Sequence, residues 1–164
     1  MALIYASPDG GKALFEGRTV KTFALNEALH RALPGDVVQL LPGLYQRAAV
    51  ITDGGREDAP NTIRGTDGTV LDGGRKSADA TRQFDPSDDD FAFFKIYTCS
   101  HLIIEQLRFI NCWPSAVFMR DVNDIERSKL HIVGGRFATH ARNKRANTTT
   151  AGVKSKRSTL DQVQ

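Results

Sequence analysis

Apolar residues in this chain gather in short runs, and corners rich in glycine, proline, aspartate and asparagine separate the runs. After residue 35 the runs are DVVQLL, Ala48–Ile51, Thr62–Arg64 and Val70–Leu71. The stretches TDGGREDAPN, GTDGT and DGGRKS lie between them, and their residue types favour tight turns. The pattern therefore predicts many very short β-strands that follow one another without helices between them.

A single helix is predicted before the first of these strands. Thr22 can cap a helix that runs to about Leu33, because apolar residues recur on or near one face: Phe23, Leu25, Ala28, Leu29 and Ala32. Pro34-Gly35 then ends the helix, since proline cannot continue its hydrogen-bond ladder. Pro42-Gly43 ends the following strand in the same way, after six positions.

Short strands without helices between them can form a sandwich or barrel, or a coil in which each strand pairs with one a full turn later. A coil predicts self-similarity at a fixed period of roughly 20–30 residues. Aligning LIIEQLRFINC with LHIVGGRFATH gives an offset of 28 residues, which sets Leu102 on Leu130, Arg108 on Arg136 and Phe109 on Phe137. This offset favours the coil, with the helix covering the open end of its first turn.

Four stretches also resemble the N-terminal region of pectate-lyase-like right-handed parallel β-helix proteins. They are IYASPDGG, FALNEALHRALPGDVVQLLPGLYQRAAVITDGG, DAPNTIRG and TVLDGG. Residues 4 to about 74 carry the resemblance, and residues 91–140 look like generic turns of such a coil. The resemblance implies an all-β fold: a right-handed parallel β-helix (solenoid) with an N-terminal capping α-helix, truncated after a few turns. The cap and first turns would occupy residues 1–140.

Charge divides the chain into two unlike parts. The formal net charge is +3, but residues 140–164 hold six basic residues against the single acid Asp161. The body before them carries 16 basic and 18 acidic residues, a net charge of −2. Residues 141–164 are therefore predicted to be a basic, disordered tail. A mildly acidic body makes nucleic acid an improbable partner.

The sequence also bears on compartment and association. No apolar run approaches the length of a membrane span, and the start has no secretory leader, so the default expectation is a cytoplasmic protein, although the relatives are often secreted. Cys99 and Cys112 are too few for a disulfide scaffold, and half-buried small apolar residues are predicted in preference to a disulfide or metal pair. An uncovered last turn near Leu130–Phe137 predicts self-association through its strand edge.

Candidate site residues are few. The acidic stretch FDPSDDDF offers four carboxylates for calcium, a cation that prefers oxygen ligands: Asp85, Asp88, Asp89 and Asp90. The residues by themselves indicate no cofactor, and Ca²⁺ is the one that the resemblance implies. Lys95 interrupts an apolar strand and would point outward. Lys95, Arg108 and Arg136 are the candidates for binding an acidic polysaccharide. The two arginines could instead pair with acids such as Glu105 and Glu126.

The resemblance implies a function related to polysaccharides. Active relatives mostly act on acidic polymers such as pectate, and the lyases among them remove a proton beside a uronate carboxylate. No position here matches one of their catalytic residues, so the sequence leaves open whether this chain is an enzyme. The leading hypothesis is the cap-proximal part of a carbohydrate-active protein, lyase- or hydrolase-like. The alternatives are a non-catalytic glycan-binding or structural module, and a truncated or frameshifted remnant without activity.

Overall fold

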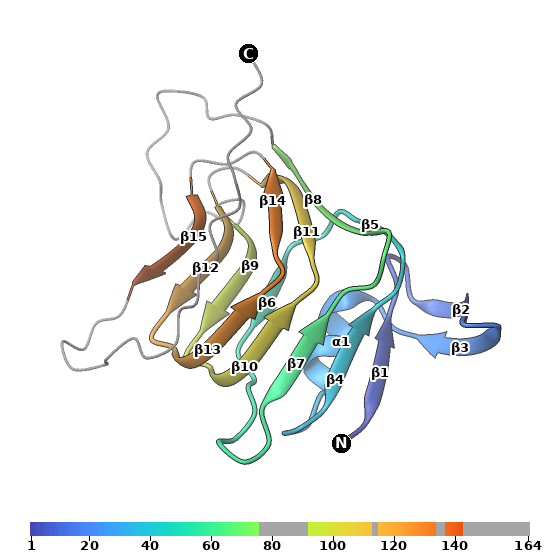
Figure 1. The fold of residues 1–164 in the computed structure, drawn as a ribbon, viewed down its shortest axis with the longest axis horizontal. Coiled ribbons are helices and arrows are strands. Elements are labelled where there is room, and N and C mark those ends of the chain that lie inside the picture. The colour runs from blue at the N-terminus through green and yellow to red at the C-terminus, as the bar shows by residue number, and fades with distance from the viewer. Residues whose placement is uncertain (76–91, 113–114, 134–136, 143–164) are drawn as a thin grey trace.

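The computed structural model describes residues 1–75, 92–112, 115–133 and 137–142 (Figure 1). Regular structure in these ranges is almost entirely β. The elements in chain order are β1 Leu3–Ala6, β2 Gly11–Phe15, β3 Arg18–Thr22, α1 Leu25–Arg31, β4 Val37–Leu40, β5 Gly43–Tyr45, β6 Ala49–Ile51, β7 Asn61–Arg64, β8 Thr69–Arg75, β9 Ala92–Tyr97, β10 Ser100–Glu105, β11 Arg108–Cys112, β12 Ser115–Arg120, β13 Asn123–Ser128, β14 His131–Val133 and β15 Phe137–Arg142.

Three parallel sheets form the body of the fold, and the chain visits them in turn. Their strand orders are β1-β4-β7-β10-β13, β5-β8-β11-β14 and β6-β9-β12-β15. We call each passage through the three sheets a circuit, so that β4 to β6 form the first circuit and β13 to β15 the fourth. Each strand pairs in parallel with the strand of the next circuit, which excludes a hairpin-built sandwich or barrel for these strands. The short predicted strands are confirmed as β4, β6, β7 and β8.

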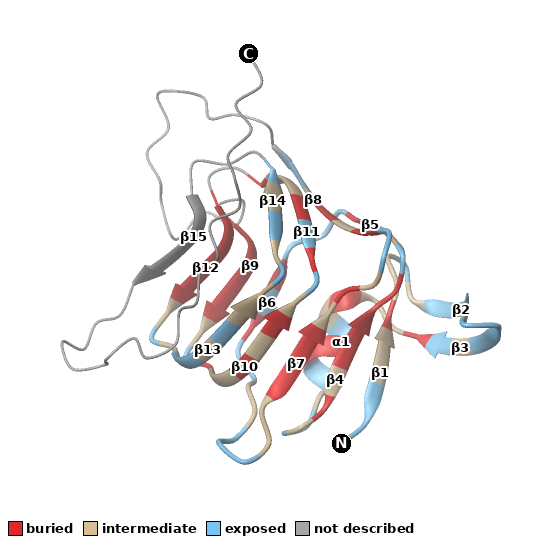
Figure 2. Cartoon of the chain, in the orientation of Figure 1, coloured by how far each residue is buried: buried red, intermediate tan, exposed pale blue. Residues whose placement is uncertain are grey.

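The core is made of columns of like side chains, because parallel in-register pairing stacks equivalent positions. In the first sheet one inward column contains Ile4, Val38, Ile63 and Ile104. In the second sheet Tyr45, Leu71 and Phe109 stack in the same way. Burial is greatest in the middle circuits and falls at β13 and β14 (Figure 2). The interior is therefore an apolar stack that runs across the circuits.

The 28-residue offset predicted from the sequence is wrong. Leu102 pairs with Ile125 and Arg108 with His131, so the third and fourth circuits repeat every 23 residues in these sheets. Backbone conformation follows the same spacing, since Gln106 has a φ of 56° and Lys129 a φ of 52°. Leucine and phenylalanine are common in strands, so their recurrence at 28 residues arose by chance and does not reflect the structural repeat. The strand pairing instead has the same 23-residue spacing as the corner residues with positive φ.

The helix is shorter than predicted and is not capped by Thr22. It begins after Ala24, which makes no side-chain capping hydrogen bond. Thr22 lies at the end of β3, where its hydroxyl is 2.8 Å from Ser7 Oγ and buried. A threonine already bonded to another segment is not available to cap the helix. At the other end α1 stops at Arg31, before Leu33, whose helical conformation the following proline disfavours.

The expected packing of the helix against the first circuit is confirmed. Leu25, Ala28 and Leu29 are buried in the same core cluster as the first strands. On the flank of the helix, Asn26 Nδ2 donates to the carbonyl of Ala48 at 3.1 Å, and its Oδ1 accepts from the amide of Val50 at 3.3 Å. The side-chain amide thus satisfies the outer edge of β6 as a neighbouring strand would.

Other segments complete the N-terminal end. β2 and β3 form an antiparallel hairpin that projects from the body (Figure 1) and that the sequence did not reveal. β15 extends to Arg142, slightly beyond the predicted boundary at residue 140, and the rest of the predicted tail lies outside the described residues. Within the described ranges, no helix has the length and apolar character needed to cross a membrane.

Candidate functional site

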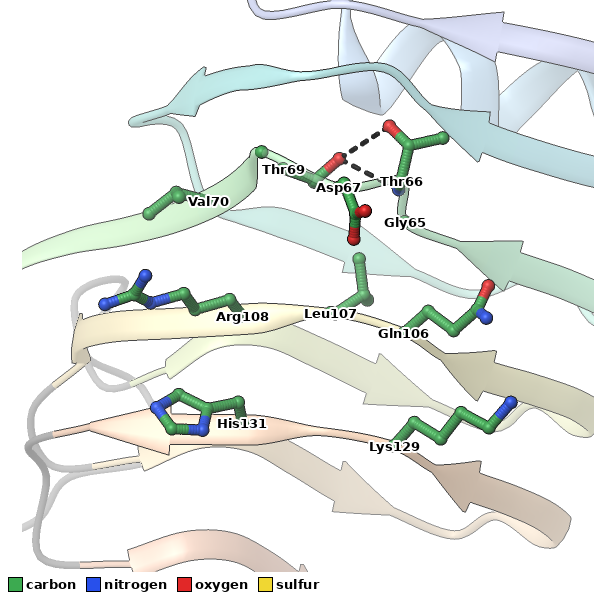
Figure 3. A pocket seen from close by; sticks show the side chains of 11 residues that line it. Gly65, Thr66, Asp67, Thr69, Val70, Gln106, Leu107, Arg108, Lys129 and His131 are labelled. Carbon is green, nitrogen blue, oxygen red and sulfur yellow. Dashed lines mark hydrogen bonds between the residues drawn. The ribbon is translucent and has the colours of Figure 1, made fainter. Parts of the chain in front are cut away.

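A groove of about 430 Å³ lies at the corner between the first and second sheets, across three successive circuits. Its wall is the loop from Gly65 to Thr69, which joins β7 to β8. Its floor is formed by Gln106 to Arg108 and by Lys129 and His131, at the equivalent corners of the next two circuits. Because the corners stack like the strands, the groove runs across three stacked circuits (Figure 3).

The wall exists because one corner is longer than its neighbours. Four residues, 65–68, connect β7 to β8, whereas two connect β10 to β11 and β13 to β14. The amide of Thr66 donates to Thr69 Oγ1 at 3.0 Å, and the Thr66 hydroxyl donates to the carbonyl of Leu40 in the preceding circuit at 3.0 Å. These bonds fix the loop to the body and hold it raised beside the floor.

Gly65 is needed at the base of this loop for steric reasons. A Cβ atom there would lie 2.2 Å from the carbonyl oxygen of Gln106. The amide of Gly65 donates to the carbonyl of Glu105 at 3.1 Å, so the two corners approach each other closely. Only a residue without a side chain allows this close approach of the wall to the floor.

The floor presents stacked side chains that point to solvent. Arg108 and His131 are paired in register on β11 and β14, and Gln106 and Lys129 occupy the preceding corner positions, as Figure 3 shows. All four side chains are exposed. Asp67 projects from the wall toward the floor and is also exposed. The groove thus combines two permanent cations, one histidine and one carboxylate.

Among the described residues, no acid neutralises either cation of the groove. Within the described part of the chain, Arg108 and Lys129 have no ion-pair partner. Glu105, which could have paired with Arg108, instead accepts a hydrogen bond from Arg64 Nε at 2.6 Å. Free cations in a groove are available for an anionic ligand.

Lys95 does not belong to this groove. It lies on β9 in the third sheet, between Val50 and Phe118, and only 6% of its surface is exposed. Its alternation with the inward-facing Phe94 and Ile96 agrees with an outward direction, but it is not a solvated lysine. Of the predicted polysaccharide contacts, the structure therefore places Arg108 in the groove and Lys95 elsewhere, while Arg136 lies outside the described residues.

The metal and cysteine predictions have different outcomes. The calcium candidates all lie outside the described residues: Asp85, Asp88, Asp89 and Asp90. The described part of the chain contains no group of three or more histidine, cysteine, aspartate or glutamate residues that could hold a metal ion. Cys99 and Cys112 are free thiols that are more deeply buried than the predicted half-burial, and burial raises the pKa of each to about 11. Such thiols are poor nucleophiles near neutral pH.

Four groove residues escaped the sequence analysis: Asp67, Gln106, Lys129 and His131. The signal that could have found two of them is the 23-residue spacing, which places Lys129 on Gln106 and His131 on Arg108. The longer corner that carries Asp67 has no counterpart in the later circuits, so alignment could not reveal it. Comparison of the chain with protein-family models, with curated proteins and with solved structures finds no match.

Proposed function

We propose that the chain is the cap and first turns of a right-handed parallel β-helix. Support comes from three parallel sheets visited in constant order and from a helix packed on the first circuit. Right-handedness is the expectation for nearly all connections between parallel strands of one sheet. The resemblance of residues 4–74 to pectate-lyase-like proteins points to the same fold.

We further propose that the groove binds an acidic polysaccharide. The observation that carries this proposal is the pair of exposed, unpaired cations, Arg108 and Lys129, on stacked corners of an open groove. Arg108 is paired with His131, and Lys129 occupies the position equivalent to Gln106, so the two cations lie diagonally on neighbouring corners (Figure 3). An extended ligand that crosses both corners can contact both cations. Gln106 and His131 beside them add donors suited to hydroxyl groups. Asp67 repels carboxylates and so restricts which sugar units fit beneath the wall.

Binding to polygalacturonate, measured by calorimetry, tests this function. The double substitution Arg108→Ala/Lys129→Ala should weaken binding by about tenfold or more, since each exposed charge pair contributes up to about 1 kcal/mol. The matched control is Lys12→Ala/Arg18→Ala, which removes two exposed cations from the β2–β3 hairpin, outside the groove. A neutral dextran should not bind. Equal losses in both double variants would mean that binding follows net charge and not the groove.

A further inference from the structure

His131 differs from the other histidines whose side chains the structure describes, because it has no acidic partner. His30 Nδ1 lies 3.6 Å from Asp53 Oδ2, and His101 Nδ1 lies 2.6 Å from Asp124 Oδ2. Within the described residues, no carboxylate lies at ion-pairing distance from the imidazole of His131, which is exposed on the groove floor. This ring is therefore available to a carboxylate that a ligand brings.

A ligand carboxylate bound at Arg108 would also lie beside His131. The two residues are in-register partners on β11 and β14, and neighbouring parallel strands lie about 4.8 Å apart. Figure 3 shows their side chains at the same end of the floor, with Gln106 and Lys129 at the other end. The amide of His131 donates to the carbonyl of Leu107 at 2.9 Å, so backbone pairing holds the two corners together. One carboxylate can thus contact the guanidinium and the imidazole at once.

The charged groups that face His131 keep their signs near neutral pH. Arg108 comes from β11, Lys129 from the preceding corner and Asp67 from the wall across the groove, while the groove residue on β8, Val70, is apolar. Guanidinium, ammonium and carboxylate groups in ordinary surroundings stay charged between about pH 5.5 and 8. An imidazole gains a proton in that interval. Histidine is therefore the side-chain type in the groove whose charge changes there.

Binding of an anion and protonation of the ring favour each other. Without a ligand, a proton on His131 places a positive charge beside Arg108, and like charges repel. A carboxylate within about 4–6 Å instead favours the charged form of the ring. Because such coupling is reciprocal, the protonated ring strengthens binding by the same factor. Affinity for an anionic ligand should therefore rise as the pH falls.

We infer that His131 takes up a proton when an acidic polysaccharide binds, so that the groove binds more tightly in mildly acidic surroundings. The proton moves from the solvent onto the unprotonated ring nitrogen and returns when the ligand leaves, and no bond of the ligand changes. The inference rests on the proposed function, because it needs a carboxylate at Arg108. It adds a residue that makes the same site responsive to pH.

Calorimetry with polygalacturonate at constant ionic strength tests the inference. The wild type should bind about fivefold more tightly at about pH 5.5 than at about pH 8, which is the value of one exposed charge pair. Near the middle of this interval, titrations in two buffers of different ionisation enthalpy should show uptake of a fraction of a proton per bound site. His131→Gln should remove both effects. His131→Lys, a cation at every pH used, should bind with no proton uptake and with the same affinity at both pH values.

His30→Gln is the matched control, because His30 is exposed on α1, outside the groove, and already has Asp53 as its acidic partner. It should keep both the pH dependence and the proton uptake of the wild type. Circular dichroism at both pH values verifies that each variant is folded, and His131→Lys supplies the comparison if His131→Gln folds poorly.

The outcomes separate this inference from the function on which it rests. A wild type that does not bind polygalacturonate at either pH would overturn the proposed function, and this inference with it. Binding that depends on Arg108 and Lys129 but has equal affinity at both pH values and no proton uptake would overturn the role of His131 alone. A pH dependence that survives in His131→Gln would also overturn that role, since another group would then take up the proton.

Discussion

The hydroxyl of Tyr45 offers a stability prediction whose size follows from the surrounding hydrogen bonds. Tyr45 is 2% exposed and its hydroxyl donates to two carbonyl oxygens, that of Ala6 at 2.8 Å and that of Leu41 at 3.0 Å. Phenylalanine keeps the ring in its column and removes only the donor. The Ala6 carbonyl still accepts from the amide of Leu41, and the Leu41 carbonyl from the hydroxyl of Thr69.

Neither carbonyl is left without a donor, so Tyr45→Phe costs the net value of a hydrogen bond and not that of a buried unsatisfied group. We expect a loss of about 1 kcal/mol in the free energy of unfolding. In urea denaturation this corresponds to a midpoint lower by roughly 0.5 M. Tyr5→Phe is the control, because Tyr5 is only partly buried, and it should leave the midpoint unchanged. A loss above about 3 kcal/mol for Tyr45→Phe would refute the reasoning.

The same residue predicts an effect at alkaline pH. Burial raises the pKa of Tyr45 well above its usual range. A group whose pKa is raised in the folded state contributes stability below its unfolded pKa, and that contribution is lost as pH rises. The wild type should therefore lose stability above about pH 10, and Tyr45→Phe should lose less over the same interval. Parallel alkaline curves for the two proteins would contradict this assignment.

Three other predictions concern the ends and corners of the fold. The Asp36 carboxylate accepts hydrogen bonds from the amides of Ala2 and Leu33, and the bond from Ala2 is the main cause of its lowered pKa. The stability that this carboxylate contributes is present above its unfolded pKa and is lost on acidification. Asp36→Asn should therefore reduce the loss of stability at acid pH. Asn26→Ala should lower the melting temperature by about 3 °C through loss of two hydrogen bonds to β6. Gly65→Ala should cost at least about 2 kcal/mol in chemical denaturation, because its Cβ would meet backbone. An unchanged acid curve for Asp36→Asn, an unchanged melting temperature for Asn26→Ala or an unchanged denaturation curve for Gly65→Ala would refute the corresponding prediction.

The sequence predicted the local elements well, because local chemistry fixes them. Proline and glycine end the strand that contains Val37–Leu40, and apolar periodicity marks a helix around Leu25, Ala28 and Leu29. These signals act within a few residues, so they are legible without the fold. The helix start was misplaced because Thr22 bonds to Ser7, a partner from another strand.

The residues that form the groove could not be predicted, because they are brought together by the pairing register of the strands, which no single segment of the sequence encodes. Arg108 was predicted as a ligand contact, but its neighbour is His131 and not Arg136. Register is set by the length of each corner and by the left-handed conformations at positions such as Gln106 and Lys129. A change of one or two residues in a corner changes every pairing after it.

Composition and local pattern by themselves determined that this chain forms many short strands that follow a single helix. The tertiary structure decided which side chains stack: it brought Arg108 and Lys129 to one groove, buried Lys95 and turned Arg127 into the core column. The physical reason is that strand and turn propensities are properties of neighbouring residues. Stacking instead depends on the summed length of each circuit, which no local pattern of residues encodes.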